Sequence, residues 1–231
     1  MEDIASKAFA TRAIHAGTPP EPETGARQFP VFQTTSFVFP SPEEAAARFN
    51  LEKVGYIYSR LTNPTVGALE ARVAALEGGP AATATSSGHA AQIMAFFPLM
   101  GPGDHIVAAR KLYGGSINQM THAYKKFGWE VTFVDFDRLD DIRAALTPKT
   151  KALFCESLAN PGGSVTDLEA VAAIAHEAGV PLVVDNTLAT PYLCRPLEHG
   201  ADIVVNSTTK FLTGNGTSIG GVVTDSGKFD W

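Results

Sequence analysis

The chain has 231 residues, 45% of them hydrophobic and 18% charged, and its 18 Lys and Arg residues against 24 Asp and Glu residues give a net charge of −6. This composition provides enough apolar side chains for a sizeable core and excludes a disordered chain. The acidic balance excludes nucleic acid as the main partner, because nucleic-acid phosphates are bound by clustered Lys and Arg.

The cysteines and the apolar runs indicate a cytoplasmic protein. Cys155 and Cys194 are the only cysteines, and neither belongs to a Cys-x-x-Cys pair, so both are expected to be small core residues. The first three residues are acidic and lack the features of a leader, and the longest apolar run, residues 90–100, is too short to span a bilayer. We therefore predict a reducing compartment and no membrane partner.

Residues 1–60 differ in pattern from the rest of the chain. Prolines interrupt residues 18–22 and 39–42, and the aromatic residues Phe29, Phe32 and Phe37 lie between these breaks. A segment with aromatic side chains but no core of its own normally packs on another surface. We expect an extended arm that packs on the main domain or on a second subunit.

From residue 61 onward, helical spacing of apolar residues alternates with short β-rich runs. The predicted helices are residues 65–76, 89–99, 116–127, 139–146 and 167–178, and the predicted strands are residues 105–109, 131–135, 152–156, 182–185, 203–206 and 221–224. Nearly all-apolar strands separated by helices predict an α/β domain over residues 61–231, with a mostly parallel sheet covered on both faces. Ligands of such sheets bind beyond the carboxyl ends of the strands.

Lys210 is the first candidate site residue, because it follows the predicted strand 203–206 and is the only charged residue between Asp202 and Asp225. An exposed loop lysine with a solvated charge is the simpler interpretation. Its place at the mouth of a parallel sheet favours a chemical role, since a partly desolvated lysine is the residue that forms Schiff bases.

Asp185 ends the predicted strand 182–185 and is the only charged residue between Glu177 and Arg195. A carboxylate at an apolar strand end is costly unless a cation meets it. It could serve as a cap for the next segment, which begins with Asn186 and Thr187. A second interpretation, a partner for a protonated ligand nitrogen, is favoured once Lys210 is considered with it.

Hydroxyl side chains and a glycine in the segment 85–88 precede the predicted helix 89–99. Such a helix start offers free backbone N–H groups and the positive end of the helix dipole to an anion, although a Ser or Thr before a helix is more often only a cap. Together with Ser207 and Thr209, it suggests a phosphate held by neutral donors. The chain contains no Gly-x-x-x-x-Gly-Lys-Ser/Thr nucleotide loop.

Two other kinds of site are disfavoured by the sequence. Residues 216–220 match the Gly-x-Ser-x-Gly elbow of hydrolases, but a predicted strand follows them and the last histidine, His199, precedes them, so the triad cannot be completed. None of the six histidines pairs with another at metal-ligand spacing with a carboxylate, so no metal site is predicted. The lysine, the aspartate and the neutral phosphate cup are instead the parts that bind pyridoxal 5′-phosphate.

Five motifs also resemble a known family. They are Ser86-Ser87-Gly88, Leu112-Tyr113-Gly114-Gly115, Glu156-Ser157-Leu158-Ala159-Asn160-Pro161, Val184-Asp185-Asn186-Thr187 and Ser207-Thr208-Thr209-Lys210. In this order they resemble the Cys/Met-metabolism family of pyridoxal-phosphate enzymes, over nearly the whole chain. The resemblance implies the aspartate-aminotransferase type of fold, fold type I.

The resemblance also implies contacts to the cofactor ring. Lys210 would be the Schiff-base lysine, and Asp185 would meet the pyridine nitrogen. Tyr113 would stack on the ring and assist proton transfer, and Asn160 would bond to its 3′-oxygen.

For the cofactor phosphate, the resemblance implies two sets of contacts. One set lies in the predicted domain: Ser87, the backbone of Gly88 and His89, Ser207 and Thr209. The other set, Tyr58 and Arg60, would reach the phosphate of the neighbouring subunit. The arm would then complete an active site in a homodimer, within a homotetramer.

Within the family, the chain resembles the O-acetylhomoserine sulfhydrylases more than other branches, in residues 87–92, 216–221 and 226–231. Asn215 departs from this pattern, in which histidine is expected at that position. This implies γ-replacement on O-acetyl-L-homoserine by sulfide or a thiol. Methionine γ-lyase or O-succinylhomoserine chemistry is the alternative. Family members continue into a C-terminal domain with a carboxylate-binding arginine, and this chain ends before it, so a cofactor-binding domain without turnover is the third interpretation.

Overall fold

The computed structural model describes residues 4–231, which form two compact units, the first ending at Arg72 and the second running from Val73 to Trp231. The sequence suggests that the arm ends at residue 60. The first unit extends further, because the division between the units falls inside helix α3 (Pro64–Glu77).

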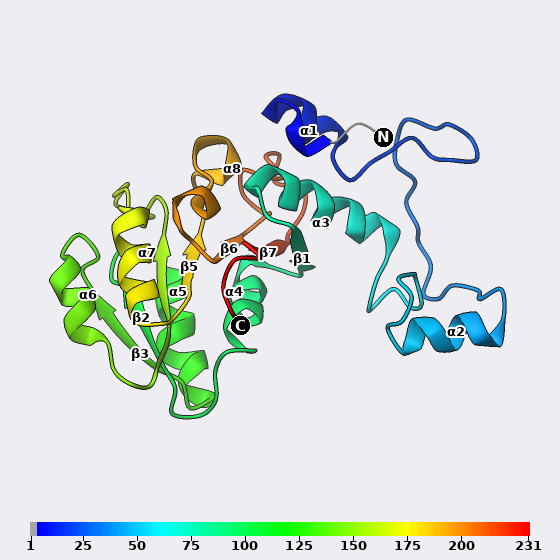
Figure 1. Ribbon diagram of the computed structural model, residues 1–231. Helices are drawn as coiled ribbons and strands as arrows, with labels where there is room; N and C mark the ends of the chain where they lie inside the picture. Colours follow the sequence, from blue (N-terminus) through cyan, green and yellow to red (C-terminus); the bar gives the residue numbers. More distant parts are fainter. Residues whose placement is uncertain (1–3) are drawn as a thin grey trace. The chain divides into compact units, whose positions relative to one another are not determined.

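The first unit contains short helices joined by turns and irregular backbone. The helices before α3 are η1 (Ile4–Ser6), α1 (Phe9–His15) and α2 (Pro42–Phe49), drawn in blue in Figure 1. Helix α2 begins where its sequence favours it, because the Ser41 side chain accepts a hydrogen bond from the Glu44 N–H at 3.2 Å and Pro42 opens the helix. The expected extended arm therefore includes helical segments.

The second unit is built on a seven-stranded sheet. Its strands are β1 (Ala81–Thr85), β2 (His105–Ala109), β3 (Glu130–Val134), β4 (Thr150–Glu156), β5 (Leu182–Asp185), β6 (Ile203–Asn206) and β7 (Gly221–Asp225). They lie in the order β1-β7-β6-β5-β4-β2-β3; β7 pairs antiparallel with both β1 and β6, and all other pairs are parallel. The predicted α/β class with a mostly parallel sheet is confirmed.

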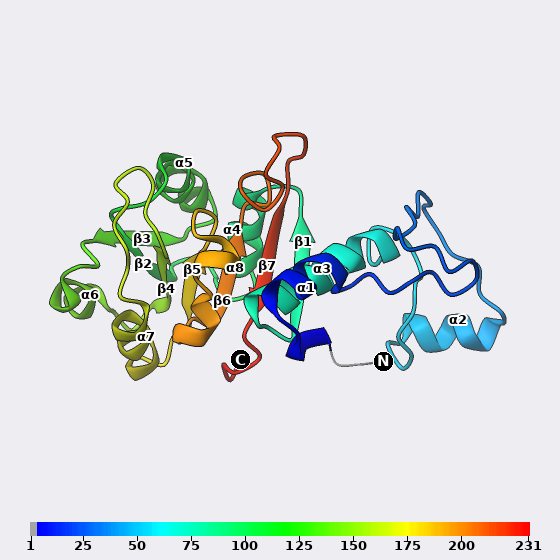
Figure 2. The same ribbon diagram turned by 90° about the horizontal axis from the view of Figure 1, so that it is seen from above.

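Helices cover both faces of this sheet. They are α4 (Gly88–Phe96), α5 (Gly114–Asn118) with its π-helical continuation η2 (Gln119–Tyr124), α6 (Leu139–Ala145), α7 (Leu168–Glu177), α8 (Thr190–Leu193) and η3 (Pro196–His199). Figure 2 shows α4 and α5 on one side of the sheet and α7 on the other. Between the layers, Phe96 packs edge-on against Tyr124 and Phe154, with ring centroids 5.8 and 5.6 Å apart.

Each predicted helix and strand of this unit corresponds to an observed element, with ends that differ by a few residues. Strand β1 was not predicted, because its Ala and Thr residues lack the β-branched apolar run typical of a buried strand. It lies at the sheet edge and pairs only with β7. Among residues 4–231, no helix has both the length and the apolar character needed to cross a membrane.

Candidate active site

The carboxyl ends of β4, β5 and β6 and the start of α4 border a cavity of about 560 Å³. All of the site residues predicted within the second unit line this cavity. They are Ser87, Gly88, His89, Tyr113, Asn160, Asp185, Ser207, Thr209 and Lys210. The cavity lies where ligands of parallel sheets bind, beyond the carboxyl ends of the strands.

Asp185 is a buried carboxylate at the end of β5, only 9% exposed. Its Oδ1 accepts a hydrogen bond from the Thr187 N–H at 3.0 Å, and its Oδ2 accepts one from Gln92 Nε2 at 3.1 Å. Burial raises the pKa of Asp185, and these hydrogen bonds oppose the rise. The cap predicted from the sequence is confirmed, because Asp185 accepts from the Thr187 N–H, and Asp185 also borders the cavity. Its contact with a protonated ligand nitrogen stays a prediction.

The predicted phosphate cup corresponds to the start of α4. Ser87 is its N-cap, since its Oγ accepts from the Ala90 N–H at 3.1 Å, which leaves the N–H groups of Gly88 and His89 at the helix start for an anion. A side chain at Gly88 would place its Cβ 2.7 Å from the Cβ of Ser207. Glycine is therefore required for the close approach of α4 to the segment after β6.

Thr209 reaches the same cup with its hydroxyl already bonded. Its Oγ1 donates to the Gly220 carbonyl at 3.2 Å and accepts from the Gly220 N–H at 3.1 Å. A rotation of the hydroxyl proton would present a donor to a phosphate. The same contacts hold Gly220 directly before β7, and this strand agrees with the one predicted after the Gly-x-Ser-x-Gly match.

Lys210 follows β6 and lines the cavity with an exposed side chain. The partial desolvation expected from the sequence is not observed. Within residues 4–231 it forms no ion pair, so its amine has no carboxylate that competes for it. The position suits a nucleophile that must meet a carbonyl ligand in the cavity.

Tyr113 and Asn160 enter the cavity from two loops that share one acceptor, Glu156. The Tyr113 N–H donates to Glu156 Oε1 at 2.6 Å, and the Asn160 N–H donates to Glu156 Oε2 at 2.9 Å. The Tyr113 ring lies beside His89, with centroids 6.1 Å apart and ring planes inclined by 26°. Burial raises the pKa of Glu156 to about 7, opposed by the two N–H donors.

Two residues of this site were missed by the sequence reasoning. Gln92 donates to Asp185 and, at 2.9 Å, to Ser116 Oγ, so it fixes the orientation of the Asp185 carboxylate. Glu156 holds the two ring-facing loops. Both lie inside motifs that the sequence singles out, but their partners are far away in the chain, so their roles could not be assigned from spacing.

Tyr58 and Arg60 lie in the first unit, where the Arg60 guanidinium lies 5.6 Å from the centroid of the Tyr58 ring. Their predicted contact with a neighbouring subunit's cofactor stays a prediction. Cys155 is a buried core residue, as expected, whereas Cys194 is only half-buried. Among residues 4–231, no group of three or more His, Cys, Asp or Glu side chains could hold a metal ion.

Fold and site together define an α/β protein with a lysine, a buried aspartate and a helix start flanked by hydroxyl side chains at the carboxyl edge of its sheet. Residues 10–231 match the family described as Cys/Met metabolism PLP-dependent enzyme. The chain belongs to this family.

Curated relatives and solved structures agree with this assignment. The chain is 53% identical to the O-acetyl-L-homoserine sulfhydrylase of Corynebacterium glutamicum, covering 96% of this chain and 51% of that protein, and 50% identical to that of Leptospira meyeri, covering 96% and 50%. It therefore spans about half of the length of the curated relatives that it matches. A crystal structure from Campylobacter jejuni, assigned as an O-acetylhomoserine (thiol)-lyase and carrying N′-pyridoxyl-lysine-5′-monophosphate, superposes with a TM-score of 0.92 at 37% identity, covering 96% of this chain and 55% of that one. A Lactobacillus plantarum cystathionine γ-lyase superposes with a TM-score of 0.88 at 36% identity, covering 95% and 55%.

Proposed function

We propose that this chain binds pyridoxal 5′-phosphate and carries the cofactor half of an enzyme in which sulfide or a thiol replaces the acetoxy group at Cγ of O-acetyl-L-homoserine, with acetate as the leaving group. The observation that carries the proposal is the convergence of Lys210, Asp185 and the Gly88 cup on one cavity. The names of the sulfhydrylase relatives at 50–53% identity support the choice of reaction. With sulfide, the reaction converts O-acetyl-L-homoserine and hydrogen sulfide into homocysteine and acetate, a step of methionine biosynthesis.

The cofactor, when bound, withdraws electrons from the carbons next to the amine that it holds. Asp185 would keep a proton on the ring nitrogen, because a carboxylate this buried favours a cationic partner. Lys210 would hold the cofactor and, once the substrate amine has displaced it, its own amine would take the proton from the substrate Cα and then transfer protons at Cβ. Tyr113 would cover the ring, and its hydroxyl would assist departure of acetate.

The remaining parts of the proposal concern the assembly. Residues 1–60 would serve as an arm that brings Tyr58 and Arg60 to the phosphate of a neighbouring subunit, in a homodimer or homotetramer in the cytoplasm. The substrate is a small amino acid, and its second reactant is sulfide. Residues 61–231 would be the domain that binds the cofactor.

The first test is cofactor binding. Mixing the purified chain with pyridoxal phosphate should produce a visible absorbance band. Borohydride reduction of the C=N bond should remove this band and leave the cofactor covalently attached to Lys210 as a permanent label. Lys210→Ala should abolish the permanent label, because no other amine lines the cavity among the described residues. Lys149→Ala, a change of an exposed lysine in the same unit, is the matched control. A label that persists in Lys210→Ala would refute the assignment.

The second test identifies the reaction. Homocysteine formed from O-acetylhomoserine and sulfide would support the proposal, whereas α-ketobutyrate from methionine would favour the γ-lyase alternative. Parallel assays with the succinyl ester define the acyl group. Cofactor labelling without turnover of any substrate would favour a cofactor-binding domain that is inactive on its own.

A further inference from the structure

Glu77 is a buried carboxylate outside the cavity. It is the last residue of α3 and is fully buried. The charge of Arg195 acts on the pKa of Glu77, but Arg195 forms its ion pair with Glu198, at 2.7 Å. Within residues 4–231, Glu77 itself forms no ion pair. A carboxylate in this position needs hydrogen-bond donors to offset its desolvation.

Two asparagine side chains supply these donors. Asn206 Nδ2 donates to Glu77 Oε1 at 2.7 Å, and Asn186 Nδ2 donates to the same oxygen at 3.1 Å, with Oε2 at 3.4 Å. Asn186 directly follows Asp185 at the end of β5, and Asn206 directly precedes Ser207 at the end of β6. Glu77 therefore connects the end of β5, where Asp185 lies, with the end of β6, which leads into Lys210.

The end of a third strand, β4, is hydrogen-bonded to the side chain of Asn186. Ser157, the residue after β4, donates its hydroxyl to Asn186 Oδ1 at 2.7 Å, and Asn186 Nδ2 also lies 2.9 Å from the Cys194 carbonyl. Both ends of the Asn186 amide are thus bonded. Because its backbone continues directly into Asp185, the fixed amide leaves Asp185 little freedom to move.

We propose that Glu77 is a positioning residue for the cofactor site. By accepting from both asparagines, it fixes the ends of β5 and β6 so that Asp185 and the Ser207–Lys210 segment face one ligand. The inference rests on the proposed function, since it concerns the binding of pyridoxal phosphate to this chain. Glu77 acts through Asn186 and Asn206 and does not itself line the cavity.

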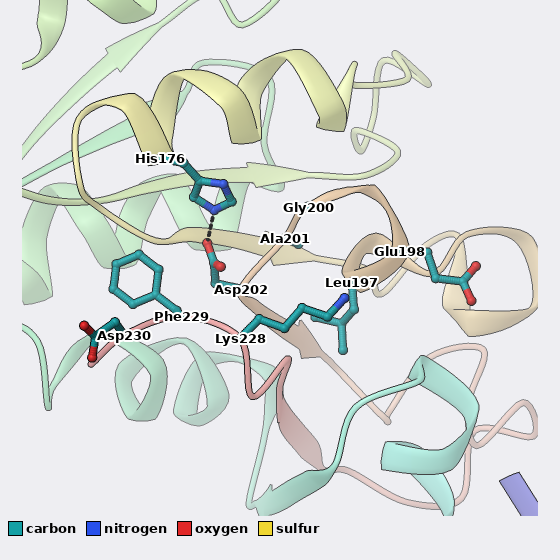
Figure 3. A pocket seen from close by; sticks show the side chains of 9 residues that line it. All are labelled: His176, Leu197, Glu198, Gly200, Ala201, Asp202, Lys228, Phe229 and Asp230. Carbon is teal, nitrogen blue, oxygen red and sulfur yellow. Dashed lines mark hydrogen bonds and ion pairs between the residues drawn. The ribbon is translucent and has the colours of Figure 1, made fainter.

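The same two strands carry a matched control at their opposite ends. Asp202 is 4% exposed, and its Oδ2 accepts from the Leu182 N–H at 2.8 Å and from His176 Nε2 at 2.9 Å. Figure 3 shows this contact at a second cavity, lined also by Lys228 and Phe229. Asp202 thus fixes the starts of β5 and β6, far from the cofactor edge.

Two substitutions to leucine separate stability from cofactor positioning. Glu77→Leu and Asp202→Leu each remove a buried acceptor that receives hydrogen bonds from two residues, and both should lower the melting temperature. Only Glu77→Leu should raise the dissociation constant for pyridoxal phosphate, and we expect a rise of about tenfold. This is the lower end of the loss in metal affinity when a residue that positions a metal ligand is mutated. It should also change the visible circular dichroism of the bound cofactor, which reports its orientation.

A conservative variant tests the role of the single oxygen. Glu77→Gln keeps Oε1 for both short hydrogen bonds, so it should retain the wild-type dissociation constant and dichroism. If Glu77→Leu does not fold, Asn206→Ala removes only one of the bonds and should still weaken cofactor binding. The dissociation constants are measured by titrating each purified full chain with pyridoxal phosphate.

Three results would overturn the inference: an unchanged dissociation constant in Glu77→Leu, an equal rise in Asp202→Leu, or an unchanged value in Asn206→Ala. Failure of the proposed function is a different result, because the wild-type chain would then bind no cofactor at all. Wild-type binding together with unaltered variants would refute the positioning role alone.

Discussion

Glu156 and Glu77 are buried carboxylates of the same kind that use their oxygens differently. Glu77 collects its two short hydrogen bonds on one oxygen, whereas Glu156 accepts the Tyr113 N–H on Oε1 and the Asn160 N–H on Oε2. A glutamine has only one acceptor oxygen. The same change should therefore be mild at position 77 and disruptive at position 156.

Glu156→Gln should loosen the loop of Tyr113 or that of Asn160, because the new NH₂ group faces a backbone N–H. We expect a loss of about 1–3 kcal/mol in the free energy of unfolding, the cost of a buried group left unsatisfied, and weaker binding of pyridoxal phosphate. Urea unfolding at pH 5, where both the wild-type acid and the glutamine are uncharged, measures the stability, and cofactor titration measures the affinity. Equal stability and affinity in the variant and wild type would show that Glu156 does not hold these loops.

At the scale of single residues, the sequence reveals those residues that stand out from their neighbours in the chain. Lys210 and Asp185 were found because long uncharged stretches flank them. Gln92 and Glu77 act on partners that only the fold brings near, so no local pattern marks them. Glu77 in particular resembles any acidic residue at a helix end.

At the scale of elements, the contact between α4 and the segment after β6 depends on a single missing side chain. Gly88→Ala would place a Cβ 2.7 Å from the Cβ of Ser207, so the helix start and Ser207 would have to separate. We expect weaker binding of the cofactor phosphate, measured as a higher dissociation constant for pyridoxal phosphate, with the helix content unchanged.

Gly67→Ala is the control for this substitution. Gly67 lies inside α3, and an added Cβ would meet no atom within 4 Å. It should stabilise the chain by up to about 1 kcal/mol, since alanine is the better helix former, without changing cofactor affinity. If Gly88→Ala binds the cofactor as tightly as Gly67→Ala, the close approach at Gly88 has no part in the site.

The elements that were predicted correctly are those whose own pattern determines their structure. Strands β2, β5 and β6 are buried, and each is apolar except for one terminal residue, so hydrophobicity marks them. Strand β1 exists because β7 pairs with it, and its Ala and Thr residues do not require a strand by themselves. Helix α5 was predicted to start at residue 116 but begins at Gly114, directly after Tyr113, and changes to π-helical geometry at Gln119.

At the scale of the whole molecule, the buried acids make the stability of the fold depend on pH. Burial raises the pKa of both Glu77 and Glu156 to about 7 from an ordinary value of 4.5. Below pH 4.5 both acids are protonated in the folded and unfolded chains, and their contribution to stability is fully present. As the pH rises to 7 the unfolded chain releases these protons first, so this contribution is lost.

We therefore expect the free energy of unfolding to decrease between pH 5 and pH 8 through these two groups. Since one unit of difference in pKa corresponds to about 1.4 kcal/mol, the loss is on the order of 3 kcal/mol for each acid. Burial lowers the pKa of His105, which has the opposite effect on the slope, so the comparison must be made between variants. Urea unfolding of wild type, Glu77→Gln and Glu156→Gln at both pH values measures it. Each variant lacks one titrating acid and should lose less stability than wild type over this interval, and an equal loss in all three chains would contradict the raised pKa values.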